Sequence, residues 1–229
     1  MNRFIYAICL TLFVNISLSA QNKDIILVKA DTKVLDYFPF QERYRYPHFI
    51  DGKVMFKSGN TSKAKLNYDI LLGEVVFIQS QDTLTISRKK DIRNIVIARD
   101  TFLYDNGYLE LIHSGNIRVG LNYYVKIKEV LKKGAFGTTA RGVSTDTYNS
   151  LESKGSLHEL IPNEDLELQK TKEYYLSTPT SGFIHFRKKN VFQLFPEKND
   201  AIKGYLKSNK VDFDSEKDLL KLADYLQNL

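Results

Sequence analysis

Hydrophobic and polar residues alternate through much of the first two thirds of the chain, and turn-forming residues separate the alternating runs. The clearest run covers residues 117–127, where apolar side chains occupy every second position. A strict period of two places these side chains on one face of a strand and does not fit the stripe of a helix. Shorter runs such as 64–68, with turn signals such as Asp51-Gly52, predict consecutive antiparallel strands from about residue 44 to residue 131.

Strands are also predicted on either side of this region. Residues 25–28 are apolar and short, as is typical of an edge strand, and residues 173–176, 183–187 and 191–195 are apolar runs separated by polar turns. Residues 132–156 are rich in Gly, Ser and Thr. This composition predicts a long mobile loop, which is either functional or simply disordered.

The last part of the chain, residues 197–229, changes to a helical pattern. Ser215 is followed three residues later by an acidic residue, as in a capping box. Leu219, Leu222 and Leu226 then fall on one face of the predicted helix. Because short helices are marginally stable alone, we expect this tail to pack on the β domain. The alternative is that Leu219, Leu222 and Leu226 form a surface for a protein partner.

These patterns together predict a mainly β fold. We expect an antiparallel sandwich or roll, or a small barrel, with two short C-terminal helices. The predicted organisation is a signal peptide at 1–20, an antiparallel β domain at 21–196 that contains the loop 132–156, and a helical tail at 197–229 packed on that domain.

The first twenty residues have the form of a secretory signal peptide. Arg3 precedes an apolar run at 4–16, and small residues lead to a predicted cleavage after Ala20. The alternative is an uncleaved membrane anchor, but the run is shorter than the roughly 20 residues that span a bilayer. We therefore predict an exported protein that does not span the membrane after cleavage, located in the periplasm, associated with the outer membrane, or released.

Removal of the signal peptide changes the composition in two ways that matter. Cys9 is the single cysteine of the chain, so the mature form would have no disulfide, thiolate nucleophile or cysteine metal site. Loss of Arg3 leaves 32 basic and 27 acidic residues, a net charge of +5. This mildly basic balance permits attraction to an anionic envelope surface and gives no reason to expect a nucleic acid as partner.

The most unusual composition lies at residues 37–49, where aromatic residues alternate with arginines. Aromatic faces beside guanidinium groups can bind sugar rings or aromatic ligands by stacking and hydrogen bonding. The candidate ligand-binding residues of this segment are Arg43, Tyr44, Arg45, Tyr46 and His48. The competing interpretation, which we favour, is that these side chains close one end of the β core.

Motifs for catalysis and for metal binding are incomplete in this sequence. His158-Glu159 lacks the second histidine of a zinc motif, residues 212–218 lack the glycine of a calcium loop, and no G-x-S-x-G elbow is present. Glu74 and Glu110 are candidates for paired carboxylates, although a strand glutamate more often faces solvent. We therefore predict no catalytic residue, no metal and no cofactor.

Several segments together resemble a group of uncharacterised exported β-rich proteins of Gram-negative bacteria. The segments that carry the resemblance are residues 66–74, 77–78, 82–84, 107–112, 194–196, 212–213 and 218–220. The resemblance implies export and a β-rich architecture, and it implies no activity for any residue.

We therefore expect a non-catalytic, exported binding or structural protein. Its expected partner is an envelope protein or the anionic envelope surface. The alternative is a protein that binds or processes a small molecule or glycan through residues 37–49. A deep pocket that gathers acidic side chains or histidines around Tyr44 and Tyr46 would favour this alternative.

Overall fold

A computed structural model describes residues 25–133, 139–142 and 157–229, so the predicted signal peptide lies outside the described residues. Within them the strands are β1 (Ile25–Val28), β2 (Ile50–Phe56), β3 (Thr61–Asp69), β4 (Glu74–Gln79), β5 (Asp82–Thr85), β6 (Ile92–Ile97), β7 (Asp100–Tyr104), β8 (Tyr108–His113), β9 (Arg118–Lys133), β10 (Thr139–Gly142), β11 (Asp165–Ser177) and β12 (Ile184–His185). The helices are α1 (Phe40–Arg43), α3 (Lys188–Leu194), α4 (Asn199–Asn209) and α5 (Glu216–Gln227), with short 3-10 turns at Val34–Tyr37, Lys89–Asp91, Leu157–Glu159 and Pro196–Lys198.

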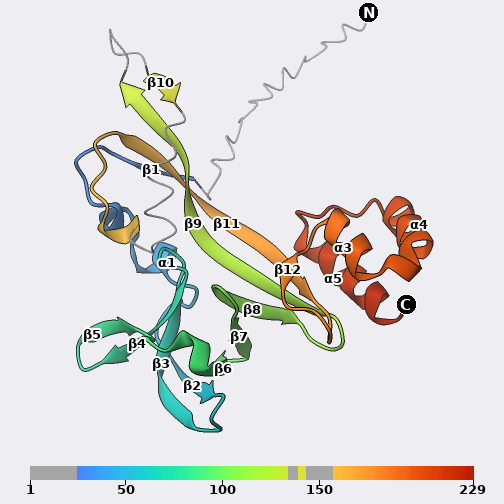
Figure 1. Ribbon diagram of the computed structural model, residues 1–229. Coiled ribbons are helices and arrows are strands. Elements are labelled where there is room, and N and C mark those ends of the chain that lie inside the picture. The colour runs from blue at the N-terminus through green and yellow to red at the C-terminus, as the bar shows by residue number, and fades with distance from the viewer. Residues whose placement is uncertain (1–24, 134–138, 143–156) are drawn as a thin grey trace, which may run out of the picture.

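All of these strands belong to one antiparallel sheet, which confirms the mainly β prediction (Figure 1). The strand order is β1-β11-β9-β8-β7-β6-β2-β3-β4-β5, while β10 pairs with β9 and β12 pairs with β11 outside this path. The sheet is therefore open, and its two ends are β1 and β5. The edge position of β1 agrees with the short apolar run from which that strand was predicted.

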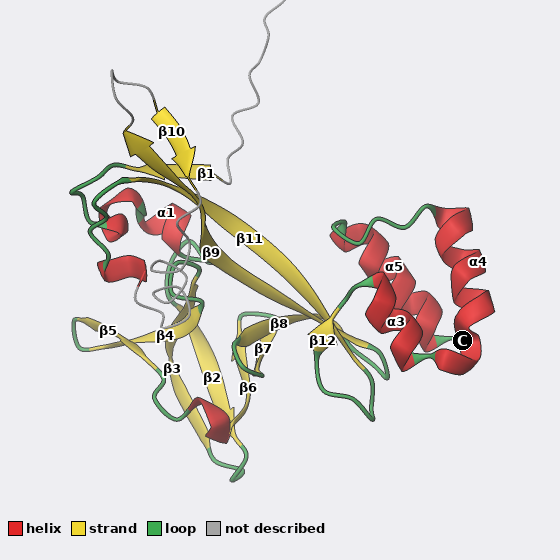
Figure 2. Cartoon of the chain, turned by 45° about the horizontal axis from the view of Figure 1, so that its top comes forward, coloured by secondary structure: helices red, strands yellow, loops and turns green. Residues whose placement is uncertain are grey.

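A long two-stranded ribbon, formed by β9 and β11, extends from the rest of the sheet. The two strands pair from Asp165 opposite Leu131 to Ser177 opposite Arg118, with one bulge next to Glu167. Thirteen residues of β11 span roughly 43 Å at about 3.3 Å per residue. Figures 1 and 2 show that this ribbon reaches the C-terminal helices at one end and lies beside β1 and β10 at the other.

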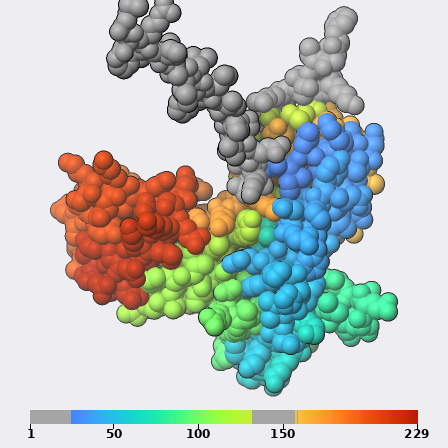
Figure 3. All heavy atoms as spheres, turned by 180° about the vertical axis from the view of Figure 1, so that it is seen from behind, coloured from blue at the N-terminus to red at the C-terminus, as the bar shows by residue number. Residues whose placement is uncertain are grey.

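Two hydrophobic clusters divide the molecule. We call residues 25–113 the body, and its cluster includes Val34, Leu66 and Phe102 together with ribbon residues from the far end of β9 and β11. We call residues 188–229 the head, and its cluster joins the helices to Val119 and Leu176 at the near end of the ribbon. Figure 3 shows the head as a separate mass to one side of the body.

Polar contacts also fasten the head to the ribbon and to β8. Glu216, at the start of α5, accepts a hydrogen bond of 3.1 Å from the Tyr174 hydroxyl and lies 3.7 Å from the Lys172 ammonium group. The His113 ring on β8 contacts Asp224 of α5, with 3.0 Å between Nε2 and Oδ1. The helices are thus held by polar side chains of one ribbon strand, β11, and of β8.

The structure corrects the predicted strand at residues 191–195, which lie in α3 and just after it. Val191, Leu194 and Phe195 are spaced three and four residues apart, so the same apolar run also fits one face of a helix. Val191 is fully buried in the head cluster, and this packing favours the helix. Of the strand predicted at 183–187, only Ile184–His185 forms, as β12.

The predicted loop at residues 132–156 needs a partial correction. Lys132 and Lys133 still belong to β9, and Thr139–Gly142 forms β10 against residues 130–133 of that strand. The remainder of the predicted loop, residues 134–138 and 143–156, lies outside the described residues.

The two helices predicted for the tail are confirmed as α4 and α5. The Ser215 Oγ accepts a hydrogen bond of 3.4 Å from the backbone N–H of Asp218, as predicted for the N-cap of α5. Leu219, Leu222 and Leu226 are buried within the head. Their packing against the helices and ribbon means that they do not form the exposed partner surface that was the alternative prediction.

Candidate functional site

The aromatic and arginine-rich segment, residues 37–49, is bound to the body by ion pairs. The Arg43 Nε lies 2.5 Å from Asp69 Oδ2, and Asp69 is completely buried. Burial raises the pKa of the Asp69 carboxyl above its usual value, an effect that the Arg43 charge opposes. Tyr44 then forms a β-bridge with Asp69 and packs its ring against Phe40, with 4.5 Å between ring centroids.

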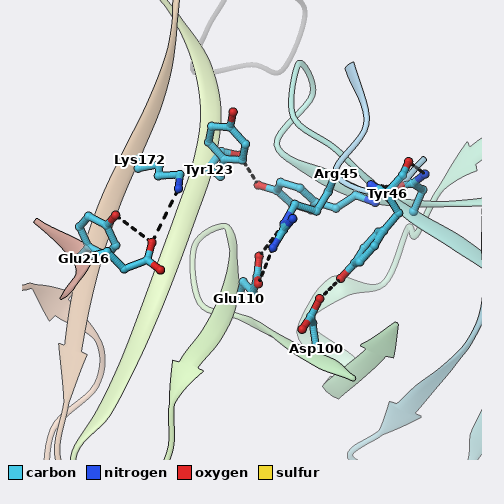
Figure 4. Close-up of polar contacts among 10 residues, drawn as sticks. Arg45, Tyr46, Asp100, Glu110, Tyr123, Lys172 and Glu216 are labelled. Atoms are coloured by element: carbon cyan, nitrogen blue, oxygen red, sulfur yellow. Dashed lines mark hydrogen bonds and ion pairs between the residues drawn. The ribbon is translucent and has the colours of Figure 1, made fainter. Parts of the chain in front are cut away.

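Arg45 and Tyr46 reach two further acidic side chains (Figure 4). The Arg45 guanidinium donates two hydrogen bonds of 3.2 Å to the carboxylate of Glu110 on β8. The Tyr46 hydroxyl donates a 2.6 Å hydrogen bond to Asp100 at the start of β7. Burial and the neighbouring Asp100 charge raise the pKa of Tyr46, so this hydroxyl remains protonated.

Asn67, a buried residue of β3, holds the backbone of the same segment. Its side-chain oxygen accepts hydrogen bonds from the N–H groups of Tyr46 and Tyr68 at 3.1 and 2.8 Å. Its amide nitrogen donates to the carbonyl oxygens of Tyr46 and His48 at 3.0 and 3.2 Å. His48 takes part in this network only through its backbone carbonyl, and the residue is otherwise exposed.

The five candidate residues are therefore neighbours in space, but most of their polar groups bind the body itself. Sequence reasoning missed the groups that engage them, because Asn67, Asp69 and Asp100 occupy positions that read as ordinary strand ends or solvent-facing sites. None of the three hollows described below is lined by residues 43–48. This geometry supports the interpretation that the segment closes the β core.

The two strand glutamates do not share a site. Glu110 binds Arg45, whereas Glu74 forms an ion pair with Lys89. Burial raises the pKa of Glu74, and the Lys89 charge partly offsets this effect. Across residues 25–133, 139–142 and 157–229, no three His, Cys, Asp or Glu side chains are grouped so that they could hold a metal ion.

A trough lies on the body between β2, β3, β4 and β5. It has a volume of about 400 Å³ and is lined mainly by apolar side chains. Its lining residues are Val54, Phe56, Ser62, Lys63, Ala64, Leu66, Phe77, Ile78, Gln79, Thr85, Ile86 and Ser87. The apolar lining is continuous with the buried cluster of the body, because Val54 and Leu66 belong to both.

A second hollow, which we call the lysine cleft, lies on the head and has a volume of about 480 Å³. Four lysines surround it, one from α3 and three from α4 and the residue that follows it. Leu206, Val211 and Phe213 supply apolar side chains. The lysines are Lys188, Lys203, Lys207 and Lys210.

Helix geometry places these lysines together. Lys203, Lys207 and Lys210 are spaced four and three residues apart, so they share one face of α4, while Ile202 and Leu206 on the neighbouring face are buried. Lys210 caps the helix with left-handed backbone angles, φ 47° and ψ 47°, a conformation that usually favours glycine. After this turn, Val211 and Phe213 line the cleft.

The charges of the lysine cleft are largely uncompensated. Within the described part of the chain, Lys203 contacts Asp200 at 3.4 Å, and the other three lysines form no ion pair. A third hollow, of about 490 Å³ beside Tyr104, also contains basic residues. There, however, Lys89 pairs with Glu74 and Arg88 lies 4.0 Å from Asp91. The lysine cleft is therefore the stronger candidate for an anion.

The fold and these hollows define a mainly β protein with a helical head that carries a basic cleft. Comparisons with protein-family models, curated proteins and solved structures find no match to this chain. The resemblance to exported Gram-negative proteins thus stays a prediction. No helix of the described residues is both long enough and apolar enough to cross a bilayer.

Proposed function

We propose that this chain is an exported, non-catalytic binding protein whose head binds an anionic component of the envelope surface. The observation that carries this proposal is the lysine cleft, where side chains from two helices surround an apolar floor. The proposed ligand class is the phosphate-bearing headgroup region of an anionic lipid.

The chemistry of the cleft suits this ligand class. Lysine ammonium groups act as mobile point charges that bind phosphate without the fixed geometry that arginine imposes. Each lysine close to an anionic bilayer contributes about 1 kcal/mol of attraction. Leu206, Val211 and Phe213 offer apolar contact between the charges, which suits a lipid interface better than a fully hydrated ion.

The alternative function, ligand binding through residues 37–49, has less support in the geometry. Arg43 and Arg45 are paired with carboxylates, and the Tyr46 hydroxyl already donates to Asp100. A ligand would have to displace these contacts before it could use the same groups. The lysine cleft requires no comparable rearrangement.

Vesicle flotation tests the surface proposal. The purified chain is mixed with phosphatidylcholine vesicles that contain or lack phosphatidylglycerol, at low and high salt. The triple variant Lys203→Gln, Lys207→Gln, Lys210→Gln should bind phosphatidylglycerol vesicles about a hundredfold more weakly, because three charges near the surface are lost. Wild-type protein should bind vesicles without phosphatidylglycerol weakly.

A matched control removes the same charge from the same head. The variant Lys198→Gln, Lys217→Gln, Lys221→Gln changes three exposed lysines that do not line the cleft. This variant should bind nearly as well as wild type. Equal losses in the two triple variants would overturn the cleft as the site. Equal binding of wild-type protein to vesicles with and without phosphatidylglycerol would overturn recognition of an anionic lipid surface.

Cell fractionation tests the export part of the proposal. A C-terminally tagged chain is expressed in a Gram-negative host, and its mass is measured in the periplasmic and envelope fractions. Cleavage after Ala20 should remove the segment that contains Cys9. Retention of the full-length chain in the cytoplasm would contradict export.

A further inference from the structure

We propose that the trough on the body binds the hydrocarbon chain of a single-chain anionic amphiphile, such as a fatty acid. This site lies between β2 and β5, at the opposite end of the molecule from the head (Figure 1). The trough shares no lining residue with the lysine cleft and would be a second ligand site of the protein.

The lining of the trough favours a hydrocarbon. Phe56, Phe77 and Ile86 are only partly buried, and Ile78 remains 38% exposed. Covering such surface with the methylene groups of a ligand is favourable, because it removes apolar area from water. Because Leu66, at the base of the trough, is already part of the body core, a bound chain would extend that core outward.

Two small residues lie opposite each other beside the trough, and one of them, Ala64, lines it. Gly52 of β2 lies opposite Ala64 of β3. A Cβ atom on Gly52 would lie 2.7 Å from the Leu66 side chain and 2.7 Å from the Val96 carbonyl oxygen. The absence of a side chain at Gly52 lets Leu66 settle against the backbone of β2, and Ala64 leaves the space beside it open.

The size and charge of the trough specify the ligand further. A volume of about 400 Å³ lies in the lower part of the range for small-molecule sites, which fits one chain better than two. Lys63 is the one charged residue among the lining residues, and it forms no ion pair with any described residue. Ser62, Gln79, Thr85 and Ser87 add hydroxyl and amide groups that can bind a carboxylate head beside Lys63.

A fluorescent fatty acid, cis-parinaric acid, provides the binding assay. Its emission should rise when the purified chain is added, and dodecanoate should displace it. Ser62→Phe and Gln79→Phe place a ring in the trough at two exposed positions. Each should weaken binding by at least about tenfold, because the ring occupies the space of several methylene groups.

Thr61→Phe is the matched control, since it adds a phenyl ring to the same strand at an exposed position that does not line the trough. It should leave the affinity unchanged, and circular dichroism melting should confirm that all three variants fold. Equal losses for Thr61→Phe and Ser62→Phe would overturn the trough as the site, as would the absence of any rise in emission with wild-type protein.

Lys63→Gln tests whether the carboxylate of the ligand lies beside Lys63. It should weaken dodecanoate binding about tenfold and leave displacement by dodecanol unchanged, because only the carboxylate interacts with the ammonium group. An equal effect on both competitors would contradict an interaction between Lys63 and the carboxylate of the ligand. The head variant Lys203→Gln, Lys207→Gln, Lys210→Gln should keep full fatty-acid affinity, so failure of this inference and failure of the lysine cleft can be told apart.

Discussion

The body and the head of this protein differ in where their polar side chains lie. In the body, Asn67, Asp69 and Glu110 are buried and engaged by partners from distant parts of the chain. In the described residues of the head, every buried side chain is apolar, and the lysines lie outside. Polar contacts thus specify the path of the chain in the body, whereas hydrophobic packing shapes the head and leaves its charges available for a ligand.

The largest expected effect comes from a cavity in the head core. Leu222→Ala removes a completely buried side chain of α5. It should lower the free energy of unfolding by about 3 kcal/mol, the usual cost of such a cavity. Hydrogen exchange should show lost protection in α3, α4 and α5, while the body strands keep theirs.

Leu66→Ala is the matched change in the body, because Leu66 is equally buried. It should reduce protection in β2, β3 and β4 and leave the head protected. If either variant reduces protection equally in both regions, the two hydrophobic clusters unfold as one cooperative unit, and the body and the head are not separate units of stability.

The second effect tests the polar network of the body. Asn67→Ala removes a side chain that makes four hydrogen bonds to the backbone of three residues. Leaving those buried groups without partners should cost about 2 kcal/mol in the free energy of unfolding measured with urea. Asn60→Ala, at an exposed turn position, should cost much less, and equal costs would show that the network is not important for stability.

The smallest expected effect concerns pH. Burial raises the pKa of Glu74 above its ordinary value of 4.5, so the folded state holds this proton more tightly than the unfolded state. The stabilisation from this proton is present at low pH and is lost as the pH rises through the raised pKa. Between these two pKa values, wild type should therefore gain stability relative to Glu74→Gln as the pH falls.

Urea unfolding of both proteins across this pH window measures the difference. Asp82→Asn, which removes an exposed carboxylate from β5, serves as the control for simple loss of charge. If wild type loses stability relative to Glu74→Gln as the pH falls, the ion pair with Lys89 outweighs burial of the carboxyl.

The sequence predicts the strands best where one face is buried. The alternation at 117–127 identified β9, although β9 continues to Lys133, and only residues 173–176 of β11 were predicted. Leu166 and Leu168 alternate with polar residues in β11 and are completely buried, so a usable signal was present there. The short apolar run in α3 fits both a strand and a helix, and only its packing against the head decides between them.

The candidate sites could be predicted only in part. The unusual composition of residues 37–49 was visible, but its partners Asp69, Asp100 and Glu110 lie on separate strands and meet it only in the fold. The spacing of Lys203, Lys207 and Lys210 is readable in the sequence, whereas Lys188 joins them only because α3 packs beside α4. A surface built from several elements therefore cannot be predicted from the local pattern of residues along the sequence.

The ribbon also determines how the molecule would respond to mechanical load. Both β9 and β11 run without interruption from the head to the body. Only β11 continues along the chain into the head, through residues 178–187, whereas β9 follows β8 of the body and meets the head by side-chain packing. A pulling force on the head would therefore pass along the backbone through β11 alone, while β8 and β9 would share it through their side-chain contacts with the head.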